Sequence, residues 1–193
     1  MAMKKIQIKD GAKKVWKFLW ESESALSWIA CFILAFLIIK LIFLPLLGLI
    51  LATPMSLVIV ESSSMEHQGN FDYFWNMKGA WYENKGINET QFSKFSFNNG
   101  LNKGDIMVLS GKKDYVIGDV IVFDIASQKT PIIHRIVEIN DGIYFTKGDN
   151  NAYQIPQDMD IKKEQIISRA VGRIPLLGWI KLFFTETFKS LGF

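Results

Sequence analysis

The sequence predicts a mainly β protein with one N-terminal transmembrane helix and a C-terminal helix at the membrane interface. Three observations predict this class: a long apolar run, several short β-branched segments between turn residues, and an apolar but interrupted C-terminal segment. We expect a basic, amphipathic N-terminus at 1–25, a transmembrane helix at 26–52, a β-rich domain at 53–178 and an amphipathic tail at 179–193.

The transmembrane helix is predicted from the run LSWIACFILAFLIIKLIFLPLLGLILA at 26–52. This run is long enough for a hydrocarbon core of about 30 Å, and too long for the apolar part of a cleaved signal peptide, about 7–15 residues. Lys40 is its one charge, and Pro45 and Gly48 favour a kink. A shifted span at about 41–60 is the alternative, because it would place Lys40 at the flank.

The charges around this helix predict its orientation. Six lysines and three acidic residues lie in the first 24 residues, and no comparable basic cluster follows the apolar run. Because basic flanks stay on the cytoplasmic side, we expect a cytoplasmic N-terminus. The chain would then be a single-pass protein of the cell membrane, with its β-rich domain outside the cytoplasm.

The rest of the composition excludes several classes of function. After Lys40 the chain carries 15 basic and 16 acidic side chains, so no basic surface for nucleic acid is expected. The single cysteine, Cys31, excludes an intrachain disulfide and a cysteine-based metal site. Only two histidines are present, which argues against a histidine-rich metal site. We therefore expect no cofactor.

The β-rich domain is predicted from six β-branched or alternating runs that are separated by Gly, Asn and Asp turn signals. They are residues 55–60, 105–110, 119–125, 131–139, 142–147 and 165–174. Strands at this spacing are typical of a sandwich or a barrel-like sheet. Residues 68–103 are rich in aromatic residues, Asn and Gly without a clear period. We interpret them as an ordered loop or small subdomain inserted after the first strand.

Serines at 62–64 are the first candidates for chemistry, because they directly follow the first predicted strand. A serine needs a base to act as a nucleophile at neutral pH, and only His67 and His134 can supply an imidazole. His67 is too close in sequence to be assumed to point at the serines. His134 lies in the strand pattern IIHRIVEI, whose alternation would place it on one face with Ile136 and Glu138.

Three aspartates follow His134 and are candidates for the acid that holds an imidazole in its tautomer. Asp149 lies in the turn sequence KGDNN, where an Asx turn is the structural alternative. Asp158 and Asp160 follow Pro156 in a loop, where exposed acids are common.

The order of these segments resembles a known family. ESSSME resembles the Ser-Gly-Ser-Met-Glu box of signal peptidase I, and GDIMVL, GDVIVF, HRIVEI and TKGDNN resemble its successive boxes in that order. GRIPLLGWIKL resembles its closing strand and membrane-proximal tail, so the resemblance extends to about residue 181. A histidine at position 134, where the bacterial branch has lysine, is similar to the archaeal and endoplasmic-reticulum branch. The resemblance implies a signal-peptidase-like β-sheet catalytic domain.

The resemblance also implies roles for individual residues. Ser64 matches the nucleophile and His134 the general base. Ser62 matches the serine whose hydroxyl helps to form the oxyanion hole with the Ser64 backbone N–H.

The acids and two departures complete the comparison with the family pattern. Asp149 matches the first family acid, and Asp158 is expected as the second, with Asp160 as its rival because this segment is longer than usual. Ser63 replaces the usual glycine of the serine box and His67 its usual proline. The second departure places another imidazole near the nucleophile.

The implied function is that of a membrane-bound serine endopeptidase that removes signal peptides from exported preproteins. Its substrates would carry small residues at the −1 and −3 positions, and the substrate strand would add to a sheet edge. Membrane lipid is an expected partner, and the export channel is a candidate partner. Two alternatives remain at this stage: a non-catalytic membrane-anchored β-domain acting as an assembly or receptor subunit, and a membrane-anchored serine protease with internal or self-cleavage specificity.

Overall fold

The computed structural model describes residues 11, 13–126 and 130–190. The chain forms two compact units, Met1–Leu47 and Gly48–Phe193. Residues 1–10 and 12 of the predicted basic N-terminus, and the last three residues of the predicted tail, lie outside the described residues.

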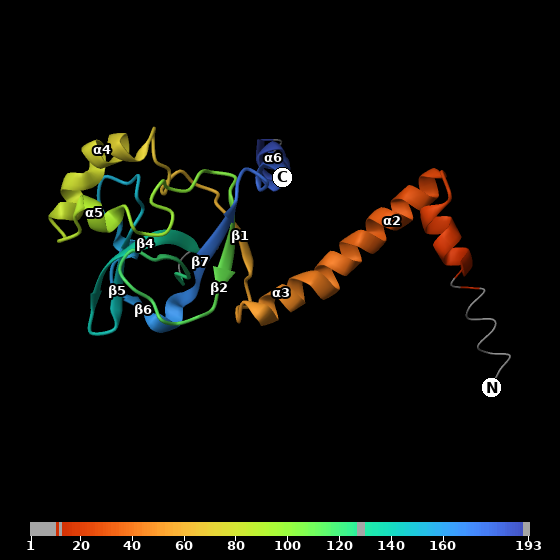
Figure 1. Ribbon diagram of the computed structural model, residues 1–193, viewed down its shortest axis with the longest axis horizontal. Helices are drawn as coiled ribbons and strands as arrows, with labels where there is room; N and C mark the ends of the chain where they lie inside the picture. The colour runs from red at the N-terminus through yellow and green to blue at the C-terminus, as the bar shows by residue number, and fades with distance from the viewer. Residues whose placement is uncertain (1–10, 12, 127–129, 191–193) are drawn as a thin grey trace. The chain divides into compact units, whose positions relative to one another are not determined.

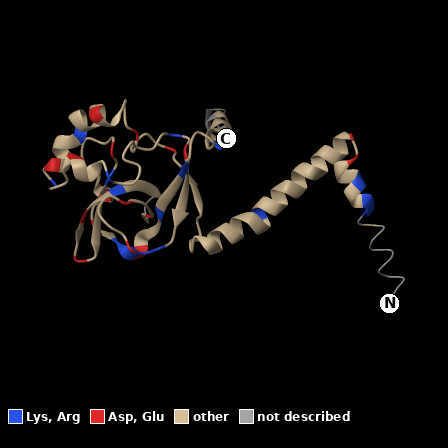
Figure 2. Ribbon diagram, viewed as in Figure 1, with Lys and Arg blue, Asp and Glu red and all other residues tan. Residues whose placement is uncertain are grey.

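A helix over Ala25–Ile50 is long and apolar enough to cross a membrane. Figure 2 shows it almost free of charged residues. It consists of α2 (Ala25–Ile38), a π-helical segment (Ile39–Phe43) and α3 (Leu44–Ile50). The Ser24 side chain caps α2 by accepting a hydrogen bond from the Ser27 backbone N–H.

The π-helical segment lies just before Pro45, where the sequence predicts an irregular helix. Proline has no backbone N–H and its ring crowds the carbonyl four residues earlier, so the regular ladder of hydrogen bonds cannot continue. The Leu44 N–H instead donates to the Ile39 carbonyl, five residues back. The alternative span at 41–60 is wrong, because the helix ends at Ile50 and a strand follows.

The second unit is built on one antiparallel sheet of seven strands in the order β1-β2-β7-β3-β4-β5-β6 (Figure 1). The strands are β1 (Leu57–Ile59), β2 (Ile106–Ser110), β3 (Val120–Phe123), β4 (Ile132–Asn140), β5 (Ile143–Lys147), β6 (Ile161–Lys162) and β7 (Ile166–Ile174). All six predicted strands are present. The two-residue β6 is an addition that the sequence pattern did not predict.

The central strand β3 is buried on both faces, which explains why its sequence is continuously apolar. Val120 and Val122 pack in a cluster that also contains Met65. Ile121 and Phe123 pack in a second cluster on the other face. The neighbouring β4 pairs with β3 so that His134 lies opposite Ile121 in the middle of the sheet.

A β-bulge in β4 corrects one prediction about this strand. The register shifts between Ile136 and Glu138, so alternation breaks there. Ile136 packs in the cluster that contains Phe123, whereas the Glu138 carboxylate binds Lys85 Nζ at 2.6 Å. The expected common face of His134, Ile136 and Glu138 is therefore wrong at Glu138.

The 68–103 insertion contains two helices, α4 (Phe71–Glu83) and α5 (Glu89–Phe92). Asn70 and Asn88 cap their N-termini through side-chain oxygens. Their aromatic side chains form a third buried cluster together with Val137 of β4, and the helices lie beside the β4–β5 end of the sheet (Figure 1).

The predicted C-terminal helix is α6 (Trp179–Ser190). Leu182 is buried, whereas Trp179, Ile180, Phe183 and Phe184 are exposed. The β-sheet unit, the apolar helix and this C-terminal helix together confirm the predicted fold class.

Candidate active site

The serine segment 62–64 is held between two backbone contacts. Before it, the Val60 N–H donates to the Asp105 carbonyl at 2.9 Å; after it, the Met65 carbonyl accepts from the Leu101 N–H at 2.8 Å. Met65 is fully buried and anchors the segment in the core. This leaves Ser62 exposed and Ser64 half-buried.

The structure brings a hydroxyl, an imidazole and a carboxylate into line. His134 Nε2 lies 3.1 Å from Ser64 Oγ, and His134 Nδ1 lies 2.5 Å from Asp158 Oδ1. The imidazole is 3% exposed and the carboxylate is fully buried. Ser62 Oγ lies 3.1 Å from Ser64 Oγ, so a second hydroxyl adjoins the first.

Asp158 is fixed by its own surroundings. It ends a short 3₁₀ helix (Pro156–Asp158), and its carboxylate accepts hydrogen bonds from Thr146 Oγ1 at 2.6 Å and the Ile155 N–H at 3.0 Å. The rival acid, Asp160, is exposed to solvent. Of the two aspartates expected in this loop, the structure places Asp158 against the imidazole.

Asp149 belongs to a different network. Arg135 Nε and Nη2 donate to its carboxylate at 3.0 and 2.7 Å, Tyr82 Oη donates at 2.9 Å, and His67 Nε2 lies 3.0 Å away. None of the contacts recorded for the described residues joins Asp149 to His134. Burial would raise the pKa of Asp149, but the Arg135 guanidinium and the hydrogen bond to His67 hold this pKa well below its usual range. The structure thus places Asp149 on the imidazole of His67 and not on that of His134.

His67 is the second histidine that could supply a base to the serines. Its ring stacks on Phe74 with centroids 3.5 Å apart and planes 4° apart. Its Nε2 is occupied by Asp149, and its buried Nδ1 has no hydrogen-bond partner among the described residues. No contact recorded for the described residues joins this ring to Ser64.

The turn after β5 packs directly behind the serine and the imidazole. A Cβ added to Gly148 would lie 2.7 Å from His134 Nε2 and 2.8 Å from the Ser64 carbonyl oxygen, so only glycine allows this approach. The Asn150 N–H donates to that carbonyl at 2.8 Å, and Asn150 Nδ2 donates to the Ser63 carbonyl at 3.0 Å. The glycine and the first asparagine of KGDNN, Gly148 and Asn150, thus pack against the serine segment.

Lys147 is a buried residue of this region that the sequence analysis did not single out. Its Nζ donates to the carbonyls of Gly148 and Asp149 at 3.0 and 3.2 Å. Desolvation lowers the pKa of Lys147 to about 8, against an opposing effect of the Asp149 charge. The clue in the sequence is a lysine directly before the turn, inside the TKGDNN box.

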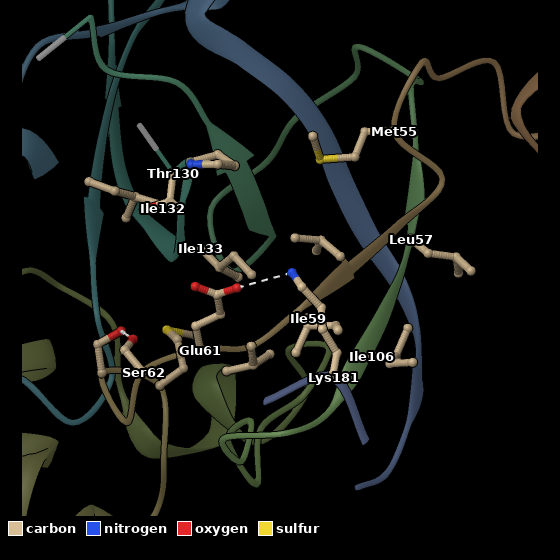
Figure 3. Close-up of a pocket in the computed structure, with 15 residues that line it drawn as sticks. Met55, Leu57, Ile59, Glu61, Ser62, Ile106, Thr130, Ile132, Ile133 and Lys181 are labelled. Carbon is tan, nitrogen blue, oxygen red and sulfur yellow. Dashed lines mark hydrogen bonds and ion pairs between the residues drawn. The ribbon is translucent and has the colours of Figure 1, made fainter. Parts of the chain in front are cut away.

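A groove of about 610 Å³ opens beside Ser64 (Figure 3). It runs from β1, whose outer edge pairs with no strand in the described sheet, to the residues that lead into β4. Its apolar lining includes Val58, Val60, Met65, Ile132 and Ile133. Near Ser62 the groove carries an ion pair between Glu61 and Lys181 of α6, 3.4 Å apart.

Hydroxyl, imidazole and buried carboxylate in this order define the class of serine hydrolases that use a histidine base oriented by an acid. Here the hydroxyl-bearing Ser64 lines an apolar groove, and the imidazole and the carboxylate are buried. Within the described residues, no group of three or more His, Cys, Asp or Glu residues could hold a metal ion.

Known proteins similar to this chain are catalytic subunits of the signal peptidase complex. The subunit of Ogataea parapolymorpha is 30% identical over 105 residues, which cover 44% of this chain and 60% of that protein. That of Yarrowia lipolytica is 32% identical over 96 residues, covering 44% and 55%. That of Dictyostelium discoideum is 33% identical over 91 residues, covering 42% and 51%. No family model matches the chain.

These relatives confirm the predicted resemblance to signal peptidase I, and the chain spans between 51% and 60% of their length. They are eukaryotic, so they support the endoplasmic-reticulum side of the predicted branch and give no support to the label "archaeal". Together with the apolar helix at Ala25–Ile50, they indicate that the chain associates with a membrane.

Proposed function

We propose that this chain is a membrane-bound serine endopeptidase that removes signal peptides from exported preproteins. The hydrogen-bonded series Ser64, His134 and Asp158, whose serine lines an apolar groove, carries this proposal. The similarity to signal peptidase catalytic subunits supports the choice of substrate.

Ser64 acts as the nucleophile in this mechanism. As its Oγ attacks the scissile carbonyl carbon, the hydroxyl proton moves to His134 Nε2, 3.1 Å away. His134 Nδ1–H donates to Asp158, which holds the tautomer and stabilises the imidazolium. The imidazolium then gives its proton to the leaving amine, and a water activated by the same imidazole hydrolyses the acyl-enzyme.

Ser62 supplies part of the oxyanion hole. Its hydroxyl lies 3.1 Å from Ser64 Oγ, within reach of the oxygen that becomes negative during the attack. The Ser64 backbone N–H is its expected partner. A donor of this kind contributes about 2.7–4 kcal/mol to transition-state stabilisation.

The groove accommodates the substrate as an extended strand. The free edge of β1 offers backbone groups to a peptide, as in other cases of strand addition. Val60 and Ile133 line the groove together with Ser64, and the signal peptidases that this chain resembles cleave after small residues. We therefore infer that small residues at the −1 and −3 positions are preferred.

The placement of the chain follows from the same proposal. The lysine-rich N-terminus lies in the cytoplasm, and the sheet domain lies on the other side of the cell membrane. Its partners are signal peptides, membrane lipid and, as a candidate, the export channel. The Ser–His chemistry is the one shared by archaeal and endoplasmic-reticulum enzymes, and no nucleic acid takes part.

A precursor assay tests the proposal. The full-length chain in liposomes should cleave a model preprotein at its signal peptide, and Ser64→Ala should reduce cleavage to background. Ser63→Ala is the matched control, because it removes a neighbouring exposed hydroxyl. Absence of cleavage by the wild type would favour a non-catalytic subunit. Cleavage by Ser64→Ala would show that the nucleophile lies elsewhere.

A further inference from the structure

One face of α4 reaches the turn behind the candidate active site. Lys78 Nζ donates to the Asn150 carbonyl at 2.9 Å, and Tyr82 Oη donates to Asp149 Oδ1 at 2.9 Å. Phe74, four residues before Lys78, stacks on the His67 ring. Residues four apart share a helix face, so Phe74, Lys78 and Tyr82 lie on one side of α4. This side faces the turn at 147–150 and His67 at the end of the serine box.

The same helix also encloses Lys147, the buried lysine of this turn. Its Nζ lies 5.0 Å from the ring centroid of Trp81 and 5.1 Å from that of Tyr82, within the range of cation–π attraction. The ammonium also donates to the carbonyls of Gly148 and Asp149. The rings of Trp81 and Tyr82 thus hold the Lys147 ammonium in place. The ammonium holds the backbone carbonyls of the 147–150 turn.

The end of the insertion holds the residue next to His134. Arg135 Nη1 donates to the Ser96 carbonyl at 2.7 Å, and Arg135 Nη2 donates to the Phe97 carbonyl at 3.0 Å. The guanidinium also lies over the Phe92 ring, 4.9 Å from its centroid. Arg135 is fully buried, and its partners therefore fix β4 at the position next to His134.

The turn transmits this support to the reacting groups. Its Gly148 lies against His134 and Ser64, and its Asn150 holds the Ser64 carbonyl by a 2.8 Å hydrogen bond. We propose that the 68–103 insertion is a positioning subdomain that holds the 147–150 turn and Arg135 behind the Ser64–His134 pair. This inference rests on the proposed function, since the reaction at Ser64 is what the insertion serves.

Another link between insertion and sheet provides a contrast. The ion pair between Lys85 and Glu138 is about a third exposed on both side chains and lies at the β-bulge. An insertion that only stabilised the fold would use this link and the Lys78 link in the same way. If the insertion is a positioning subdomain, loss of the Lys78 and Tyr82 links slows catalysis and loss of the Lys85 link does not.

The test compares two matched double variants of the full-length chain in detergent micelles. Lys78→Met with Tyr82→Phe removes the two hydrogen bonds to the turn. Lys85→Met with Tyr73→Phe makes the same chemical changes at the Glu138 link and at an exposed tyrosine of α4. Three quantities are measured for each: kcat and KM for a model preprotein, the unfolding temperature, and the imidazole NMR signals of ¹³C-labelled histidine. The chain has two histidines, so His134 can be followed as one of two signals.

The first pair should lower kcat about tenfold with KM within about twofold, because a small misplacement of reacting groups slows the chemical step more than binding. It should also shift the His134 signal, whereas the control pair should leave both kinetic constants and this signal as in the wild type. Equal effects of the two pairs, or a raised KM with unchanged kcat, would overturn the inference. If the wild type cleaves no preprotein, the proposed function fails, and the His134 signal still decides: a shift in the first pair alone supports positioning, and no shift refutes it.

Discussion

The two histidines of this chain are both buried and both bind an aspartate, yet their surroundings differ. His134 uses one ring nitrogen for Asp158 and presents the other to Ser64. His67 uses one nitrogen for Asp149, and its other nitrogen faces no hydrogen-bond partner among the described residues. A His–Asp pair becomes a general base only where its free nitrogen meets a hydroxyl.

The two aspartates differ in the same way. Asp158 is bound by neutral donors from Thr146 and the Ile155 backbone, besides the imidazole. Asp149 is bound by the Arg135 guanidinium, which already compensates its charge. An imidazolium that forms during a reaction gains most from a carboxylate without another cation, so we propose Asp158, and not Asp149, as the acid of the reaction.

The largest expected effect separates the two histidines. His134→Ala should reduce preprotein cleavage by about 10⁴-fold or more, because the reaction loses its base. His67→Ala should stay within about tenfold of the wild type, since its ring only supports Asp149. Initial rates of cleavage at equal enzyme concentration measure both, and a reversed order would assign the base to His67.

The next effect separates Asp158 from Asp160. Asp158→Asn should lower kcat by up to about 10⁴-fold with the fold preserved, because the amide no longer holds the required tautomer. Asp160→Asn should be nearly silent, since this side chain is exposed. Steady-state kinetics together with circular dichroism make the comparison. A folded but inactive Asp160→Asn would instead assign the role of the acid to Asp160.

Asp149→Asn should act mainly on stability. It leaves the buried Arg135 charge without its partner, a change that typically costs about 3–5 kcal/mol. The pKa of Asp149 is held below its usual value, so its contribution is complete above about pH 4 and is lost as the pH falls further. Urea unfolding at pH 7 and pH 3 should show the gap between wild type and variant narrowing in acid. A constant gap would mean that the charge of Asp149 plays no part.

Lys147 gives the smallest predicted effect, and its pH dependence lies on the alkaline side. Desolvation lowers its pKa from 10.5 to about 8, so between these values the unfolded chain binds more protons than the folded one. The wild type should therefore gain up to about 3 kcal/mol of stability relative to Lys147→Met as the pH rises from 8 to 10.5. The exposed Lys94→Met should follow the wild type throughout. Parallel curves for Lys147→Met and the wild type would contradict the buried, partly neutral amine.

The strands were predictable because their signals are local. Alternation and turn residues marked all six predicted strands, including β4 with His134. The bulge at Ile136–Glu138 was not predictable, because it depends on pairing with β5. Helix α4 was hidden for another reason: besides its buried Phe74, Trp75 and Tyr82, it carries exposed Tyr73 and Met77, which mask the helical period.

The site was predictable where a sequence box carries it. Ser64 and His134 stood out from the order of the boxes, and the structure places them within hydrogen-bond distance. Two partners of Asp149 could not be predicted from the sequence, because His67 lies 82 residues away and Tyr82 lies 67 residues away along the chain. The choice between Asp158 and Asp160 likewise depends on Thr146 and on the short 3₁₀ helix.

Direct labelling of the nucleophile tests the central claim that Ser64 is activated by His134. The full-length chain is treated with a small-residue peptide that carries a serine-reactive electrophile, and the adduct is located by mass spectrometry. We predict an adduct on Ser64 that forms in the wild type and in His67→Ala and is lost in His134→Ala. An adduct on Ser62 or Ser63, or undiminished labelling of Ser64 in His134→Ala, would contradict the claim.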